Sequence, residues 1–90
     1  MNIQERFQKF DGDNPHIYAE LVALTRQAYE RGRKKIGMKM LFEILRWNRL
    51  INTTGKDFKL SNDFTSRYSR KIMSEYPELD GMFDIKELTA

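Results

Sequence analysis

Apolar residues recur at helical spacing through most of the chain, and this pattern predicts four to five helices. In the first short helix, Asn2 is expected to cap the N-terminus, with Glu5 three residues on as its capping-box partner. Ile3, Phe7 and Phe10 then share one face of that helix. The first ten residues therefore contribute one amphipathic element to the core.

The second expected helix has the clearest pattern in the chain. Residues 11–14 predict a turn, after which Asn14 serves as a cap and Pro15 takes the first helical position. The helix ends at Gly32, a residue type that favours helix termination. Its apolar face comprises Tyr18, Leu21, Val22, Thr25, Ala28 and Tyr29. The cations that follow at residues 31–35 complement the helix dipole, so part of this basic cluster has a structural explanation.

A third helix is expected from Gly37 to Asn48 and is apolar on most of its sides. One stripe comprises Met38, Leu41, Phe42 and Leu45, and Met40, Ile44 and Trp47 widen it. This pattern predicts the central core helix, with Trp47 filling the core beside Ile44 and Leu50. An exposed Trp47 would instead indicate a surface that binds a partner, because tryptophan commonly anchors interfaces.

The pattern changes between Leu50 and Leu60. β-branched and aromatic residues there suit extended structure, and Thr54-Gly55-Lys56 is typical of a turn. We therefore expect a short β-hairpin, or an ordered loop, around residues 50–60. Two strands alone are marginally stable, so this segment must pack on the helices.

A fourth helix follows, capped by Ser61 or Asn62 and ended by Pro77. Phe64, Tyr68 and Ile72 lie on its expected buried side. In the tail, residues 78–88 place Leu79, Met82, Phe83 and Leu88 at the spacing of a last short helix that Gly81 interrupts.

These elements predict one mostly α-helical domain over residues 1–90, a small bundle of four to five helices. A winged-helix or helix-turn-helix arrangement is a variant of this fold, with residues 50–60 as the wing. About twelve residues separate the third and fourth helices, whereas a helix-turn-helix uses a turn of about 3–4 residues. A tight turn at residues 32–36 instead places the most apolar helix in a DNA groove. Neither register fits cleanly.

The composition excludes several kinds of chemistry. The chain has no cysteine and one histidine, which rules out disulfides and thiolate metal sites. His16 lies in a first helical turn, where a surface position is expected, and residues 11–14 match a calcium loop poorly. We expect no enzyme activity, no cofactor and no metal. No apolar stretch is long enough to span a membrane, and we expect no membrane association.

Charge is distributed unevenly along the chain, whose net charge is +3. Residues 26–71 hold 13 basic and 4 acidic side chains, whereas residues 1–25 hold 2 and 4 and residues 72–90 hold 1 and 5. A basic middle attracts polyanions and speeds association with them. The alternative is that these cations are ordinary solvated helix faces.

The leading functional hypothesis is therefore a non-enzymatic module that binds nucleic acid, DNA rather than RNA. Phosphates would be neutralised by Arg33, Lys34, Lys35, Lys56, Arg67, Arg70 and Lys71. Bases would be read by Asn62, Ser66, Arg67 and Arg70, from the fourth helix. A structural alternative is that Arg67 and Arg70 pair with the acidic tail at Glu78, Asp80 and Asp84.

Several short sequence words also resemble a family of small phage and prophage proteins of uncharacterised function. The words lie at residues 7–10, 14–18, 41–47, 58–62, 68–70 and 77–83. The resemblance implies a viral origin and action in the bacterial cytoplasm, and it supplies no activity or ligand. It raises a competing hypothesis, a module that binds and inhibits or redirects a host protein such as a defence complex. The pattern leaves the oligomeric state open.

Overall fold

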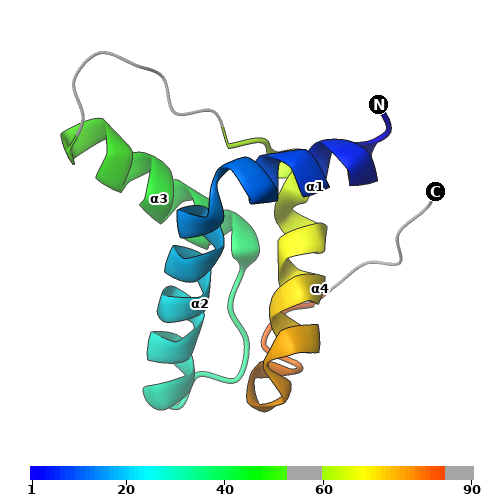
Figure 1. Cartoon of the computed structure of the whole chain (residues 1–90). Coiled ribbons are helices and arrows are strands. Elements are labelled where there is room, and N and C mark those ends of the chain that lie inside the picture. The colour runs from blue at the N-terminus through cyan, green and yellow to red at the C-terminus, as the bar shows by residue number, and fades with distance from the viewer. Residues whose placement is uncertain (53–59, 85–90) are drawn as a thin grey trace.

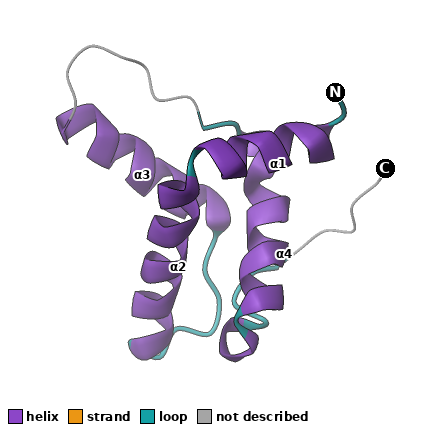
Figure 2. Ribbon diagram, viewed as in Figure 1, coloured by secondary structure: helices purple, strands orange, loops and turns teal. Residues whose placement is uncertain are grey.

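The computed structural model describes residues 1–52 and 60–84. Its elements are α1 (Ile3–Asp13), α2 (Pro15–Glu30), α3 (Met38–Asn52), the 3-10 turn η1 (Asn62–Phe64), α4 (Thr65–Glu75) and the 3-10 turn η2 (Pro77–Leu79). Every regular element in these two ranges is helical (Figures 1 and 2). The described chain is therefore an all-α globule of four helices, as the hydrophobic periodicity predicts.

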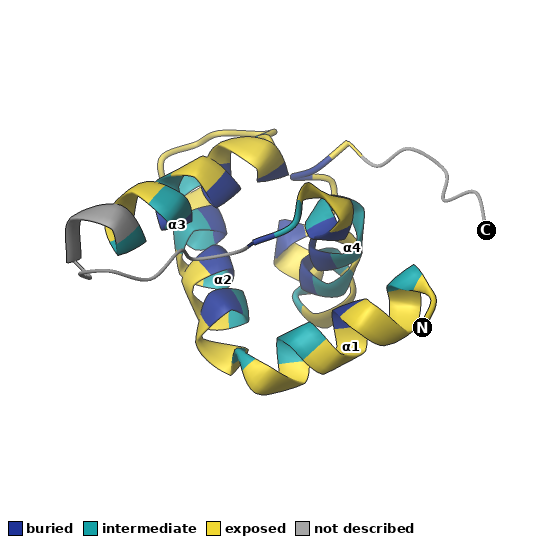
Figure 3. Ribbon diagram, turned by 90° about the horizontal axis from the view of Figure 1, so that it is seen from above, coloured by how far each residue is buried: buried dark blue, intermediate teal, exposed yellow. Residues whose placement is uncertain are grey.

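The helices are arranged around α2 and α4, which run in the same direction (Figure 1). α1 crosses the N-terminal ends of both, and the view from above places α1 and α3 on opposite sides of this pair (Figure 3). Side chains bridge the space between α2 and α4, since the rings of Tyr18 and Tyr68 stack with centroids 6.4 Å apart. The core thus lies where all four helices meet.

The junction between α1 and α2 is tighter than the expected turn over residues 11–14. The Glu5 amide donates a hydrogen bond to Asn2 Oδ1 at 2.9 Å, which confirms the cap, but α1 then continues to Asp13. Only Asn14 breaks the helix, with φ −134° and ψ 60°, because a residue before proline disfavours the helical region. Pro15 begins α2 at once, so a single residue sets the angle between the two helices.

The prediction of a β-hairpin around residues 50–60 is wrong for its first strand. α3 ends at Asn52 rather than Asn48, so residues 50–52 are helical and not extended. β-branched residues have only a context-dependent preference for strands, and the helix continues through Ile51. The predicted turn at residues 54–56, including Lys56, lies outside the described residues.

Residues 77–84 form a 3-10 turn and a bend where the start of the last helix is expected, and the rest of that expected helix, residues 85–88, lies outside the described residues. Tyr76 has ψ 86°, so Pro77 ends α4 as predicted, and η2 follows directly. Gly81 adopts φ +88°, which a residue with a Cβ disfavours and which turns the chain back towards the core. Met82 and Phe83, which follow this turn, are buried, as is Leu79 before it.

Tyr68 is the centre of an aromatic cluster in the core. Its ring makes T-shaped contacts with the rings of Phe7 and Phe42, with centroids 4.8 Å and 6.0 Å apart, respectively. The Tyr68 side chain is fully buried. Burial raises the pKa of its hydroxyl, and that hydroxyl has no hydrogen-bond partner among the described residues. A buried polar group without a partner costs free energy on folding.

The Tyr68→Phe substitution is therefore expected to leave the free energy of unfolding unchanged or to raise it by about 1 kcal/mol. The ring contacts remain while the desolvation cost of the hydroxyl disappears. Urea denaturation followed by circular dichroism measures the difference. A loss of more than about 1 kcal/mol would show that the hydroxyl donates a stabilising hydrogen bond.

Candidate functional site

The outer face of α4 carries three of the predicted nucleic-acid contacts. Arg70 is exposed and has no ion pair within the described residues, and Arg67 and Ser66 lie on the same side of the helix. The Arg67 Nε atom donates a hydrogen bond to Gln4 Oε1 at 3.0 Å. This hydrogen bond ties Arg67 to α1, so Arg70 is the freest cation on this face.

Two other predicted contacts on or beside α4 are already engaged within the fold. Lys71 forms an ion pair with Asp11 and lies over the ring of Tyr18, with Nζ 4.2 Å from the ring centroid. Asn62 Oδ1 accepts a hydrogen bond from Arg46 at 2.8 Å. Binding a phosphate or a base through Lys71 or Asn62 would require these contacts to break.

The remaining predicted cations among the described residues lie in the loop after α2, and α4 begins at the opposite end of the molecule from the C-terminus of α2 (Figure 1). Arg33 and Lys34 are exposed, and neither has an ion pair in the described part of the chain. Lys35 pairs with Asp84, and the neighbouring Ile36 amide donates to the Met82 carbonyl at 2.8 Å. Lys35 also lines a small pocket together with Ser69 of α4, so this loop reaches the side of that helix.

Within the described residues, the acidic tail pairs with cations other than Arg67 and Arg70. Glu78 forms an ion pair with Arg26 at 2.9 Å, and this hydrogen bond lowers the pKa of the Glu78 carboxyl. Asp84 pairs with Lys35. Neither Arg67 nor Arg70 forms an ion pair with the tail residues that the structure describes. Exposed pairs of this kind contribute little to stability.

A groove between α2 and α3 has a volume of about 1290 Å³. Its apolar lining comprises Leu24, Ala28, Ile36, Met40, Leu41 and Ile44. Its polar lining includes Gln27, Glu30, Arg31, Arg33 and Lys35. We refer to this feature as the α2–α3 groove. The cations belong to the loop after α2 and therefore lie at one end of it.

Trp47 is exposed, so the prediction that it fills the core is wrong. Its exposed fraction is 60 %, and that of Met40 is 53 %. Met40, Ile44 and Trp47 follow the spacing i, i+4, i+7 and form one stripe on α3, opposite the buried Phe42 and Leu45. We call these three residues the apolar stripe. It extends the apolar wall of the α2–α3 groove along α3.

α3 is apolar on two sides, and the side that carries Phe42 and Leu45 is fully buried in the core. The second side is covered only in part, since Ile44 packs against the core whereas Met40 and Trp47 stay exposed. The sequence carried this signal, since the stripe from Met40 to Trp47 lies about half a turn from the stripe that contains Phe42.

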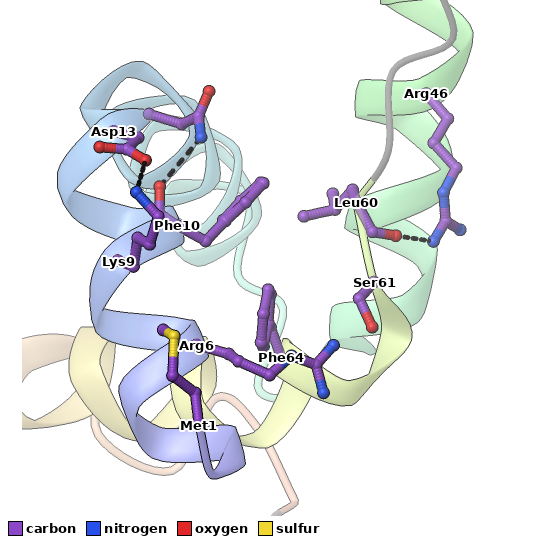
Figure 4. Close-up of a pocket in the computed structure, with 10 residues that line it drawn as sticks. Met1, Arg6, Lys9, Phe10, Asp13, Arg46, Leu60, Ser61 and Phe64 are labelled. Carbon is purple, nitrogen blue, oxygen red and sulfur yellow. Dashed lines mark hydrogen bonds and ion pairs between the residues drawn. The ribbon is translucent and has the colours of Figure 1, made fainter.

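A second groove, of about 720 Å³, lies beside α1 and the start of α4 (Figure 4). Phe10 and Phe64 line it, with ring centroids 5.3 Å apart. Two of its three cations are neutralised locally. Lys9 pairs with Asp13 at 3.1 Å, and Arg46 pairs with Glu43. This groove offers less unpaired charge than the α2–α3 groove.

Side chains suited to catalysis are not grouped in the described part of the chain. No three histidine, cysteine or carboxylate side chains there converge on a possible metal position. His16 is exposed, as predicted, and the Tyr18 hydroxyl donates to Glu75 at 2.6 Å. Burial and this carboxylate together raise the pKa of Tyr18, which makes it a poor general base near neutral pH. None of the described helices has the length and apolar character needed to cross a bilayer.

Comparisons with protein-family models, curated proteins and solved structures found no match to this chain. The resemblance to phage proteins stays a prediction.

Proposed function

We propose that this chain is a non-enzymatic protein-binding module that acts inside a bacterial host cell and contacts its partner through the apolar stripe and the α2–α3 groove. The exposure of Trp47 carries this proposal. Large apolar side chains that cluster on a surface mark interaction sites, and tryptophan is among the residue types that contribute most to binding. Met40 and Ile44 supply the adjoining apolar area on the same helix.

Trp47→Ala is expected to abolish capture of a protein partner from nuclease-treated bacterial lysate. The substitution removes the indole that is proposed to contribute most to binding, and it leaves the core side chains in place. Tyr29→Ala provides the matched control. Tyr29 is also an exposed aromatic residue, 45 % exposed, and it does not line the α2–α3 groove. Affinity capture with the wild-type chain and both variants, followed by mass spectrometry, measures the effect.

Equal capture by Trp47→Ala and the wild-type chain would contradict the proposal, as would the absence of any captured protein. Equal loss in both variants would show that capture depends on general surface hydrophobicity rather than on the apolar stripe.

Nucleic-acid binding is the second candidate function, supported by the lack of ion pairs at Arg33, Lys34 and Arg70 within the described residues. DNA contact through the outer face of α4 is the winged-helix or helix-turn-helix form of this candidate. The same experiment separates the two functions. A nucleic-acid binder loses its captured material on nuclease treatment, whereas a protein-binding module retains it.

A further inference from the structure

The α2–α3 groove has two chemically different ends. The apolar stripe continues one of its walls, and cations from the loop after α2 lie at the other end. An occupant must therefore match apolar area and positive charge at separate positions along its length. Fewer partners meet this requirement than would fit a groove that is apolar along its whole length.

The apolar portion fits a helix. Met40 and Trp47 are seven residues apart on α3, which corresponds to about 10 Å along the helix axis. An amphipathic helix lying in a groove presents apolar residues at i, i+3, i+4 and i+7, and this repeat spans a similar distance. Leu24 and Ala28 of α2 supply the opposite wall. A partner helix of about two to three turns covers this length.

The cations of the groove determine which charge a partner must carry. Arg31 and Arg33 line the groove, and neither has an ion pair among the described residues. The third lining cation, Lys35, is already neutralised by Asp84. Glu30 is the one acidic side chain in the described lining, against the two unpaired arginines. The uncompensated charge is positive, so carboxylates of a partner gain favourable contacts here and cations are repelled.

We infer that the α2–α3 groove binds an acidic amphipathic helix of a partner protein, with its apolar face against the apolar stripe and its carboxylates against Arg31 and Arg33. This inference rests on the proposed function and specifies the partner for the same surface. Because the cations lie at one end of the groove and the apolar stripe at the other, the position of the carboxylates along the partner helix determines the direction in which it binds.

The test uses the fluorescence of Trp47, which is the single tryptophan of the chain. The probe is a synthetic peptide of about 15 residues, with leucines at helical spacing and glutamates gathered at one end. A second peptide has lysines in place of the glutamates. The acidic peptide is expected to shift the Trp47 emission to shorter wavelength in a saturable titration, because the indole leaves water. The basic peptide is expected to bind at least about tenfold more weakly.

A charge-reversed variant tests the assigned cations. Arg31→Glu combined with Arg33→Glu is expected to raise the Kd for the acidic peptide at least about tenfold and to improve binding of the basic peptide. Lys39→Glu is the matched control, since Lys39 is an exposed cation of α3 that does not line the groove. Circular dichroism of each variant confirms that the fold is retained.

The outcomes separate this inference from the proposed function. If neither peptide binds while capture from lysate still depends on Trp47, the inference is overturned and the proposed function stands. A blue shift with duplex DNA but not with the acidic peptide overturns both. A blue shift that follows protein concentration alone identifies a second copy of this chain as the occupant and overturns the inference.

Discussion

Replacing Phe42 by alanine is expected to lower the melting temperature by more than about 12 °C or to leave the chain unfolded. Phe42 is fully buried and meets the ring of Tyr68 at 6.0 Å between centroids, where α3 packs on α4. Loss of a buried phenylalanine costs about 3–5 kcal/mol. A domain of this size has a total stability of roughly 5–13 kcal/mol, so one substitution removes a large share of it. Thermal unfolding followed by circular dichroism measures the change.

Trp47→Ala on the same helix is the internal control for Phe42→Ala. Both substitutions truncate an aromatic residue of α3, but Trp47 is 60 % exposed, and its loss should change stability by less than about 0.5 kcal/mol. If Trp47→Ala destabilised the fold as strongly as Phe42→Ala, the tryptophan would belong to the core and the apolar stripe would not be a free surface.

Leu79→Ala is expected to cost about 2–5 kcal/mol, although the residue lies in a 3-10 turn near the end of the described chain. Its side chain is fully buried, and η2 packs against both α2 and α4. The buried side chain of Leu79 therefore connects α2 and α4, which make few direct contacts with each other. Urea denaturation of the variant measures the loss.

The adjacent Glu78→Gln substitution is the control for Leu79→Ala. It removes the carboxylate that pairs with Arg26, but this ion pair is exposed and screened by solvent, so stability should change little. A similar loss in both variants would mean that the segment is held by charge rather than by burial. A negligible loss in Leu79→Ala would show that η2 detaches from the helices without cost.

The helices that begin with a cap could be predicted from the sequence. Asn2 caps α1, and Ser61 accepts a hydrogen bond from the Asp63 amide at 3.1 Å, in the turn that leads into α4. Such signals are local, since the donor and the acceptor lie two or three residues apart. The end of α3 carries no comparable local signal before Asn52, and the prediction there was wrong.

The candidate site was harder to predict because it is formed between elements. Local periodicity shows that Trp47 shares a face with Met40, but not whether another helix covers that face. Which cations remain unpaired also depends on contacts distant in sequence, such as Lys71 with Asp11. Net charge along the chain identified a basic region, and it could not separate the engaged cations from the available ones.

The hydrogen bond between the Ile36 amide and the Met82 carbonyl has a consequence for how this surface tolerates mutation. It fastens the loop that carries Arg31 and Arg33 to a segment whose side chains complete the core. The two portions of the groove are therefore constrained unequally. The exposed side chains of Met40 and Trp47 can diversify while the chain continues to fold, whereas a shift of the loop backbone disturbs the core itself. Selection for a new partner would act first on α3.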